Sequence, residues 1–226
     1  MNGFLDLFIR FLPDFMRGAG ITLLLTFEGL AAGFILGLLS ALGRTYGGTV
    51  WKWVSITYIE LFRGTPLLVQ LFLIYYGLPG LGVTFSREWA AFLALGLNSG
   101  AYQAEYLRGS ILAIGDGQMT AGRAIGMSKW KTIIYIILPQ ALRLAIPAWA
   151  NEPVSLLKST AVVFLIAVPE LMAKAKSMAA QTYNPIGSYI AVAIIYLAMV
   201  YLLDALLKWA ERRSTIPGFE VEGKKA

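Results

Sequence analysis

The residues that could do chemistry in this sequence are acids, arginines and hydroxyl side chains, because its 226 residues include no His and no Cys. Those two side chains are the commonest general bases, thiol nucleophiles and transition-metal ligands. The sequence groups no nucleophile with a base, so we predict no catalytic residue and no metal site. It also lacks the G-x-x-x-x-G-K-[ST] loop that binds nucleotide phosphates. Any chemistry driven by ATP therefore requires a partner protein.

Two acid–arginine pairs stand three residues apart in apolar surroundings. Glu60 and Arg63 occur in YIELFRGTPLLVQ, and Glu105 and Arg108 occur in YQAEYLRGS. On a helix this spacing places both side chains on one face, where each charge offsets the cost of burying the other. We interpret both pairs as structural ion pairs. Direct contact of Glu60 and Arg63 with a substrate is the alternative.

Glu28, in TLLLTFEGLAAGF, differs from these pairs because no basic residue lies within one turn of it. An ionisable side chain inside a membrane span faces the bundle interior or water, and is by default a candidate for function. A role in transport is one hypothesis. The alternatives are pairing with a basic residue of another helix, and simple protonation.

A further group of polar residues surrounds a proline in WANEPVSLLKST, residues 149–160. The candidates for contact with a solute are Asn151, Glu152, Ser155, Lys158 and Ser159. Broken helices of this kind present backbone groups and polar side chains to a solute at membrane depth. An ordinary polar loop at the outer surface is the alternative.

Membrane spans must position these residues, since 58% of the residues are hydrophobic and only 14% are charged. A helix needs about 20 apolar residues to cross a hydrocarbon core of roughly 30 Å. We predict an all-α integral membrane protein with five transmembrane helices. They lie at about 18–42, 64–82 (with an interfacial lead-in from Trp51), 88–108, 131–150 and 187–208.

Two features near these spans interrupt regular helices. Gly64 and Pro66 are expected to kink the entry to the second span. The apolar run 159–169 would reach only about 16 Å as a helix, so it is too short to cross the membrane. We predict that it forms a partial or surface helix shielded by protein on one side.

The distribution of Lys and Arg orients the five spans. If the C-terminus is cytoplasmic, the cytoplasmic segments hold eleven Lys and Arg residues and the outer segments hold six. The excess of basic residues on the cytoplasmic side predicts an N-terminus outside and a cytoplasmic tail at about 209–226. The net charge of +6 is thereby explained by orientation, and no nucleic-acid partner is predicted.

The basic, small-residue segment QMTAGRAIGMSKWKTIIYIILPQ, residues 118–140, lies between two apolar stretches. Thr120, Ala121 and Gly122 are followed by Gly126, and the segment ends in I-x-L-P at residues 136–139. This spacing resembles the EAA loop of ABC importer permeases. The segments YIELFRGTPLLVQL, AYQAEYLRGSI, ILPQALRLAIP and SLLKST are each similar to parts of the polar amino acid branch of that family.

The resemblance implies a single permease domain, residues 1–226, with the MetI-like fold of type I ABC importers. It implies a non-catalytic subunit that moves polar amino acids across the cytoplasmic (inner) membrane of a prokaryote. Its implied partners are the lipid bilayer, an external solute-binding protein, a second identical or related permease, and ABC ATPase subunits that hold the ATP and Mg. The loop at about 110–130 would form the helix that couples the permease to the ATPase. The coupling residues are Thr120, Ala121, Gly122, Arg123 and Gly126.

Two residues depart from the family pattern. Thr120 replaces the usual Glu of the EAA element, and Ser159 stands where many relatives have Asp. An acid that contacts the substrate therefore cannot be assigned to position 159. The amino acid carried stays open, because Glu28 and Glu152 would suit a cationic side chain and Lys158 an anionic one. The alternative function is an ion-coupled secondary carrier, with Glu28 as its proton or sodium site.

Overall fold

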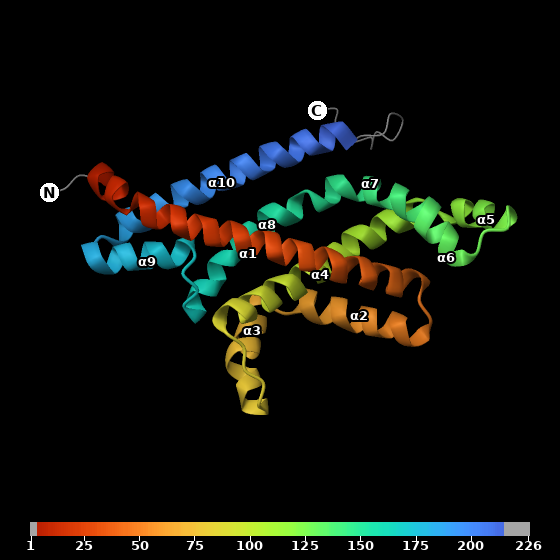
Figure 1. The fold of residues 1–226 in the computed structure, drawn as a ribbon, viewed down its shortest axis with the longest axis horizontal. Coiled ribbons are helices and arrows are strands. Elements are labelled where there is room, and N and C mark those ends of the chain that lie inside the picture. Colours follow the sequence, from red (N-terminus) through yellow and green to blue (C-terminus); the bar gives the residue numbers. More distant parts are fainter. Residues whose placement is uncertain (1–3, 215–226) are drawn as a thin grey trace.

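The computed structural model describes residues 4–214, and within that range every element is helical (Figure 1). The α-helices are α1 (Phe4–Tyr46), α2 (Thr49–Gly64), α3 (Leu67–Phe72), α4 (Arg87–Ala113), α5 (Asp116–Ala124), α6 (Lys129–Thr132), α7 (Leu138–Trp149), α8 (Asn151–Ser159), α9 (Leu171–Thr182) and α10 (Pro185–Ser214). Short π-helical or 3-10 segments continue some of them: η1 (Leu73–Gly77), η2 (Leu78–Leu81), η3 (Ile133–Ile137) and η4 (Thr160–Ile166). The prediction of an all-α protein is confirmed.

The first helix, α1, begins well before the predicted span 18–42, because its first turns are amphipathic. Phe8, Phe11 and Phe15 recur every three or four residues, and they join a core cluster with side chains of α9 and α10. Asp14 and Arg17 face solvent on the opposite side and form an exposed ion pair. The charges that end the apolar span therefore do not end the helix.

At the centre of the bundle lies α4, against which α1 packs along much of its length. Small side chains of α4 are fully buried, and they let neighbouring helices approach closely. They include Ala90, Ala91, Ala94, Ala101 and Ala104. Because other helices enclose it, α4 can carry the buried polar residues Ser99 and Gln103 at membrane depth.

Three unbroken helices of the described range are long and apolar enough to cross a membrane: Asp6–Tyr46, Lys129–Trp149 and Pro185–Trp209. Two bent pairs, Thr49–Gly64 with Leu67–Leu81 and Asn151–Ile166 with Leu171–Thr182, raise the number to five if each pair is one span. The predicted span 88–108 falls on α4, which has 27 residues but is not in this set. We assign α4 as a span because protein shields its polar side chains from lipid.

The two interruptions predicted from the sequence differ in sharpness. At Gly64–Pro66 the chain turns by 106° between α2 and α3, so α3 projects away from the bundle (Figure 1). The apolar run 159–169 forms η4, followed by Ala167 in a left-handed conformation. Val163 and Ile166 of this run are buried against α1, α3 and α4, so the run is a partial helix inside protein.

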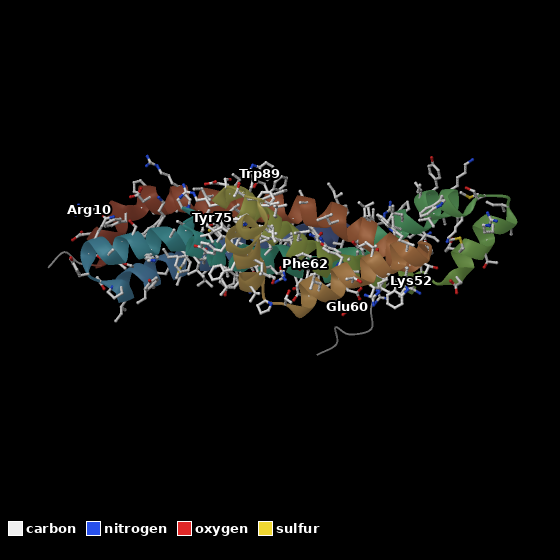
Figure 2. All side chains as sticks on the ribbon, turned by 90° about the horizontal axis from the view of Figure 1, so that it is seen from below. Arg10, Lys52, Glu60, Phe62, Tyr75 and Trp89 are labelled. Atoms are coloured by element: carbon white, nitrogen blue, oxygen red, sulfur yellow. The ribbon has the colours of Figure 1, made fainter. Side chains whose placement is uncertain are left out.

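The two ends of the elongated bundle carry different elements (Figure 1). At one end, α5 and α6 lie beside the last turn of α1, where the Lys129 ammonium donates a hydrogen bond to the Tyr46 carbonyl at 2.8 Å. At the other end, α9 packs against the first turns of α1. In Figure 2, Arg10 lies at the α9 end, and Lys52 of α2 lies toward the other end. The helix α10 ends toward the α5 end, and residues 215–226 of the predicted tail lie outside the described residues.

We predict that Thr49, at the turn between α1 and α2, and Thr84, before α4, lie on opposite sides of the membrane. Both residues are exposed, and the chain has no Cys of its own. In intact cells, a membrane-impermeant maleimide should label Thr84→Cys, and it should label Thr49→Cys only after permeabilisation. The unsubstituted chain serves as the blank. Labelling of both positions from outside would refute the predicted orientation.

Candidate functional site

A cavity of about 290 Å³ lies where the α2–α3 break meets α4 and α8. Its lining is Thr65, Pro66, Leu67, Asn98, Tyr102, Tyr106, Glu152, Ser155, Leu156 and Ser159. The volume is near the lower bound of about 300 Å³ for small-molecule pockets. Three of the residues proposed from the sequence, Glu152, Ser155 and Ser159, therefore lie together in one wall. Among the described residues, Glu152 is the only charged side chain of the lining.

The Glu152 carboxylate is held in the cavity wall by a chain of hydrogen bonds. Ser99 Oγ donates to Glu152 Oε1 at 2.7 Å, and Gln103 Nε2 donates to Ser99 Oγ at 3.0 Å. Trp149 Nε1 donates to Gln103 Oε1 at 2.7 Å, and Gln103 Nε2 also reaches the Leu30 carbonyl at 3.2 Å. Four helices, α1, α4, α7 and α8, therefore fix the orientation of one buried acid.

The opposite wall is the break between α2 and α3, where two amide side chains donate hydrogen bonds to backbone carbonyls. Gln70 Nε2 donates to the carbonyls of Phe62 and Thr65 at 2.8 and 3.0 Å. Asn98 Nδ2 donates to the Phe62 carbonyl at 3.2 Å and to Gln70 Oε1 at 3.1 Å. The carbonyls released by Gly64 and Pro66 thus find partners inside the protein, as a membrane interior requires.

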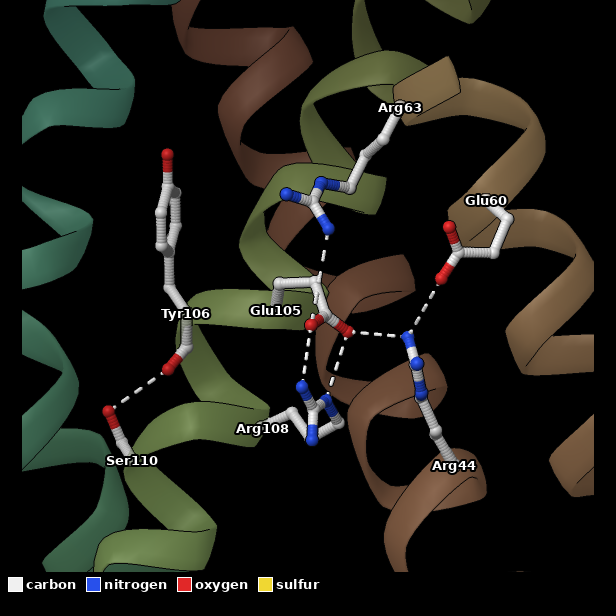
Figure 3. Close-up of polar contacts among 7 residues, drawn as sticks. All are labelled: Arg44, Glu60, Arg63, Glu105, Tyr106, Arg108 and Ser110. Carbon is white, nitrogen blue, oxygen red and sulfur yellow. Dashed lines mark hydrogen bonds and ion pairs between the residues drawn. The ribbon is translucent and has the colours of Figure 1, made fainter.

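Glu105, next in sequence to the cavity residue Tyr106, is the centre of a charged cluster whose residues come from α1, α2 and α4 (Figure 3). Arg108 donates to its carboxylate twice, at 3.0 and 2.7 Å, which confirms the predicted Glu105–Arg108 pair. Arg44 of α1 donates to Glu105 at 2.8 Å. Glu60 and Arg63 do not form the predicted pair: Glu60 lies 3.4 Å from Arg44, and Arg63 lies 4.0 Å from Glu105. That prediction was wrong because both residues meet partners on other helices.

The remaining candidates for a solute path lie outside the cavity lining. Asn151 and Lys158 are exposed on α8, and Glu28 is half-buried on α1. No salt bridge between described residues includes Glu28 or Lys158. The structure therefore brings together three of the five candidate residues named in segment 149–160 and leaves Glu28 apart from them.

A second hollow, about 620 Å³ in volume, lies between α1, α4 and α7 and is of a different kind. Its lining is Phe27, Leu30, Ala31, Phe34, Leu107, Leu142, Arg143, Ala145, Ile146 and Trp149. We call it the apolar groove. Arg143 is its only charged residue, and an apolar wall offers few partners to a zwitterionic solute.

The predicted coupling element is formed by α5 and the turn that follows it. The carbonyls of Gly122 and Arg123 accept hydrogen bonds from the N–H groups of Met127 and Gly126, which closes the helix end around Gly126 at φ +85°. Arg123 Nη1 donates to the Met127 carbonyl at 3.0 Å. Thr120 Oγ1 donates to the Asp116 carbonyl one turn earlier. Gly126 therefore lies at the turn that ends α5.

Gly122 is the residue of this element with no room for a side chain. A Cβ there would lie 2.5 Å from Thr132 Cγ2, whereas nothing lies within 4 Å of a Cβ at Gly126. The close contact seats α5 on α6, and it leaves Ala121 and Ile125 exposed on the outer side. The requirement for glycine at position 126 therefore comes from its backbone angle and not from crowding.

Sequence reasoning missed Gln70, Asn98, Tyr102, Tyr106 and Gln103. The two tyrosines and Asn98 line the cavity. Gln70 binds the carbonyl of the lining residue Thr65, and Gln103 binds Ser99, the partner of Glu152. A signal was present, since an amide side chain in an apolar helix needs partners at membrane depth. That signal could not identify the hydrogen-bond partners, because the partner residues lie on other helices. Among the described residues, no group of acids could hold a metal ion.

The sequence matches the family model described as binding-protein-dependent transport system inner membrane component over residues 33–216. It is 38% identical over 207 residues to the glutamine transport system permease protein GlnP of Escherichia coli K12, across 91% of this chain and 94% of that protein. It is 41% identical over 204 residues to the L-cystine transport system permease protein TcyB of Bacillus subtilis, across 90% of this chain and 87% of that protein.

Solved structures give the same picture for the fold. One chain of an amino acid ABC transporter crystallised with histidines superposes with a TM-score of 0.86 at 38% identity, covering 94% of this chain and 99% of that one. A chain of the MetNI methionine ABC transporter superposes with a TM-score of 0.76 at 21% identity, covering 92% and 99%. The second likeness concerns the fold alone. Both matches extend over the whole bundle.

We predict that Gln70→Leu destabilises the protein, because it leaves the partly buried Thr65 carbonyl without the amide donor of the buried Gln70 side chain. An unsatisfied buried polar group costs about 1–3 kcal/mol. The apparent melting temperature of the purified protein in detergent should fall by several degrees. Gln181→Leu is the matched control, since Gln181 is exposed and donates only to Ser177. Equal melting temperatures for the two variants would show that Gln70 does not support the break.

Proposed function

The chain belongs to the family of binding-protein-dependent transport system inner membrane components, and on this premise we propose that the cavity between α3, α4 and α8 holds the amino acid in transit. The chain is a permease subunit of an amino-acid ABC importer. The observation that carries the proposal is the orientation of Glu152, a buried acid held toward a polar cavity beside the break between α2 and α3. Family membership lends no support to an ion-coupled carrier, so Glu28 is not proposed as an ion site.

The chemistry of the lining favours amino acids with an uncharged polar side chain. Glu152 can offset the ammonium group that every amino acid carries. Ser155, Ser159, Thr65 and Asn98 then offer neutral donors and acceptors to the side chain. A cationic side chain would place a second positive charge in a cavity with one carboxylate. We therefore propose glutamine-like substrates, which agrees with the name of the E. coli relative.

We propose that α5 and the Gly126 turn dock on a partner ATPase that holds ATP and Mg. Exposed side chains at this end of the bundle support the proposal, including Ile125 at 77% and Trp130 at 53% exposure. Exposed apolar side chains gathered at one end of a bundle are a usual mark of a protein interface. The path from the cavity to α5 is short, since α4 carries Tyr106 and ends at Ala113, three residues before α5 begins.

The remaining partners follow from the same family. We propose a second permease copy, identical or related, an external solute-binding protein, and the inner membrane of a prokaryote as the setting. The apolar groove and the exposed apolar face of α10 support a further protein or lipid contact, because residues such as Ile194, Leu197 and Leu202 are about half exposed or more. We propose that the α5 end faces the cytoplasm, as the Lys and Arg distribution predicts.

We predict that the purified permease–ATPase complex binds glutamine more tightly than arginine, because the lining holds one acid. Ser159→Asp adds a second carboxylate and should strengthen arginine binding about tenfold, equivalent to about 1.4 kcal/mol. Equilibrium dialysis with radiolabelled amino acids measures both. Ser177→Asp, on the exposed face of α9, is the control for added charge. Tighter arginine than glutamine binding by the unsubstituted complex would contradict the proposed substrate class.

We predict that Gly126→Leu uncouples transport from ATP hydrolysis. Space is open around Gly126, so the cost is the left-handed backbone of about 1–2 kcal/mol, and the turn should reshape to relieve it. In proteoliposomes with ATPase and binding protein, glutamine moved per ATP hydrolysed should fall at least fivefold. Gly20→Leu is the control, because that α1 glycine also has open space and lies far from α5. If Gly126→Leu moves as much glutamine per ATP as the unsubstituted permease, this segment only connects two helices and does not couple the subunits.

A further inference from the structure

The charged cluster around Glu105 contains one cation that is only loosely held. Three arginines, Arg44, Arg63 and Arg108, face two acids, Glu60 and Glu105, so the cluster carries one excess positive charge. The Glu105 carboxylate already accepts hydrogen bonds from Arg108 and Arg44 at 2.7 to 3.0 Å. Arg63 stays 4.0 Å away, beyond hydrogen-bond distance, and its side chain is 39% exposed.

The position of Arg63 links this cluster to the cavity. Its guanidinium lies 5.4 Å from the ring centre of Tyr102, which lines the cavity, and Thr65, two residues along the chain, lines it as well. Figure 3 shows Arg63 reaching from α2 toward Glu105 on α4. Along α4, the order Tyr102, Glu105, Arg108 leads from the cavity toward α5. Arg63 therefore lies between the cavity and the end of the bundle that carries the coupling element.

The charge on Arg63 complements what the cavity lacks. The lining, as formed by residues 4–214, contains an acid for the ammonium group of an amino acid but no cation for its carboxylate. A guanidinium presents several N–H donors in a planar fork that matches a carboxylate, and it stays charged at any physiological pH. None of the Arg63 donors makes a hydrogen bond to another described residue. Arg63, beside the cavity residue Tyr102, is thus a cation whose donors are available to a substrate carboxylate.

We propose that Arg63 forms a second binding position on the transport path, which takes the α-carboxylate of the amino acid as it leaves the cavity toward the coupling end. This inference rests on the proposed function of the cavity. The amino acid exchanges an ammonium contact with Glu152 for a carboxylate contact with Arg63. Glu105, already paired with Arg44 and Arg108, keeps its own charge compensated while Arg63 turns to the substrate.

The kinetic test compares Arg63→Gln, Arg63→Lys and the control Arg17→Gln in proteoliposomes that contain ATPase and binding protein. Arg17 is an exposed arginine near the far end of α1, paired only with Asp14. For Arg63→Gln the maximal rate of glutamine uptake should fall about tenfold, while glutamine binding to the purified complex changes less than twofold. Arg63→Lys should retain at least a third of the rate. A tenfold loss of binding in Arg63→Gln would place Arg63 in the cavity site and overturn the proposal.

A second readout separates carboxylate binding from a purely structural role. Liposomes are loaded with glutamine or with glutaminamide, which lacks the carboxylate, so that either compound meets the inner position from the coupling side. For the unsubstituted permease, internal glutamine should slow uptake at least fivefold more than glutaminamide at equal concentration. Arg63→Gln should abolish this difference and Arg17→Gln should keep it. A difference that persists in Arg63→Gln, or that is absent without substitution, refutes the proposal.

The two proposals fail in different ways. If the unsubstituted complex neither binds nor accumulates glutamine, the proposed function of the cavity fails, and the Arg63 position falls with it. If glutamine binds, is transported and depends on Glu152, but Arg63→Gln transports at the parental rate, only the second position is wrong.

Discussion

A chain inside a bilayer can interrupt a helix only where protein groups take over the hydrogen bonds that the helix releases, and this constraint shapes the whole structure. At the first break, Gln70 and Asn98 bind the carbonyls of Phe62 and Thr65. At the second, after η4, Arg87 donates to the Ala167 carbonyl at 2.8 Å, and Glu170 accepts from the N–H groups of Met172 and Ala173. Both breaks are therefore tied to other parts of the bundle.

The same constraint explains why the site lies where it does. Asn98, one of the two amides that satisfy the first break, also lines the cavity together with residues of α8. Glu152 of α8 accepts a hydrogen bond there from Ser99 of α4. The helix α4 thus contributes Asn98 to the cavity and, further along, Glu105 and Arg108 to the charged cluster. From Asn98 to Ala113 this helix spans about 22 Å, and it leads directly to α5. A shift of α5 would be carried to the cavity by one continuous helix.

Local patterns in the sequence predicted the helical class, the break at Gly64 and Pro66, and the Glu105–Arg108 pair. Each of these depends on residues within a few positions of one another. The sequence could not identify Arg44 as the partner of Glu60, since they lie on different helices. Likewise, Asn98 and Tyr102 joined Glu152 in the cavity only through packing. The apolar part of α1 was predicted but its amphipathic start was not, because its partners are on α9 and α10.

The central claim is that the cavity between the α2–α3 break, α4 and α8 is the place where the amino acid rests inside the membrane. A cryo-electron microscopy map of the permease–ATPase complex in saturating glutamine tests it most directly. The account predicts density for glutamine in this cavity, with its ammonium group within hydrogen-bond distance of the Glu152 carboxylate. Glutamine density in the apolar groove between α1, α4 and α7, with the cavity empty, would contradict it.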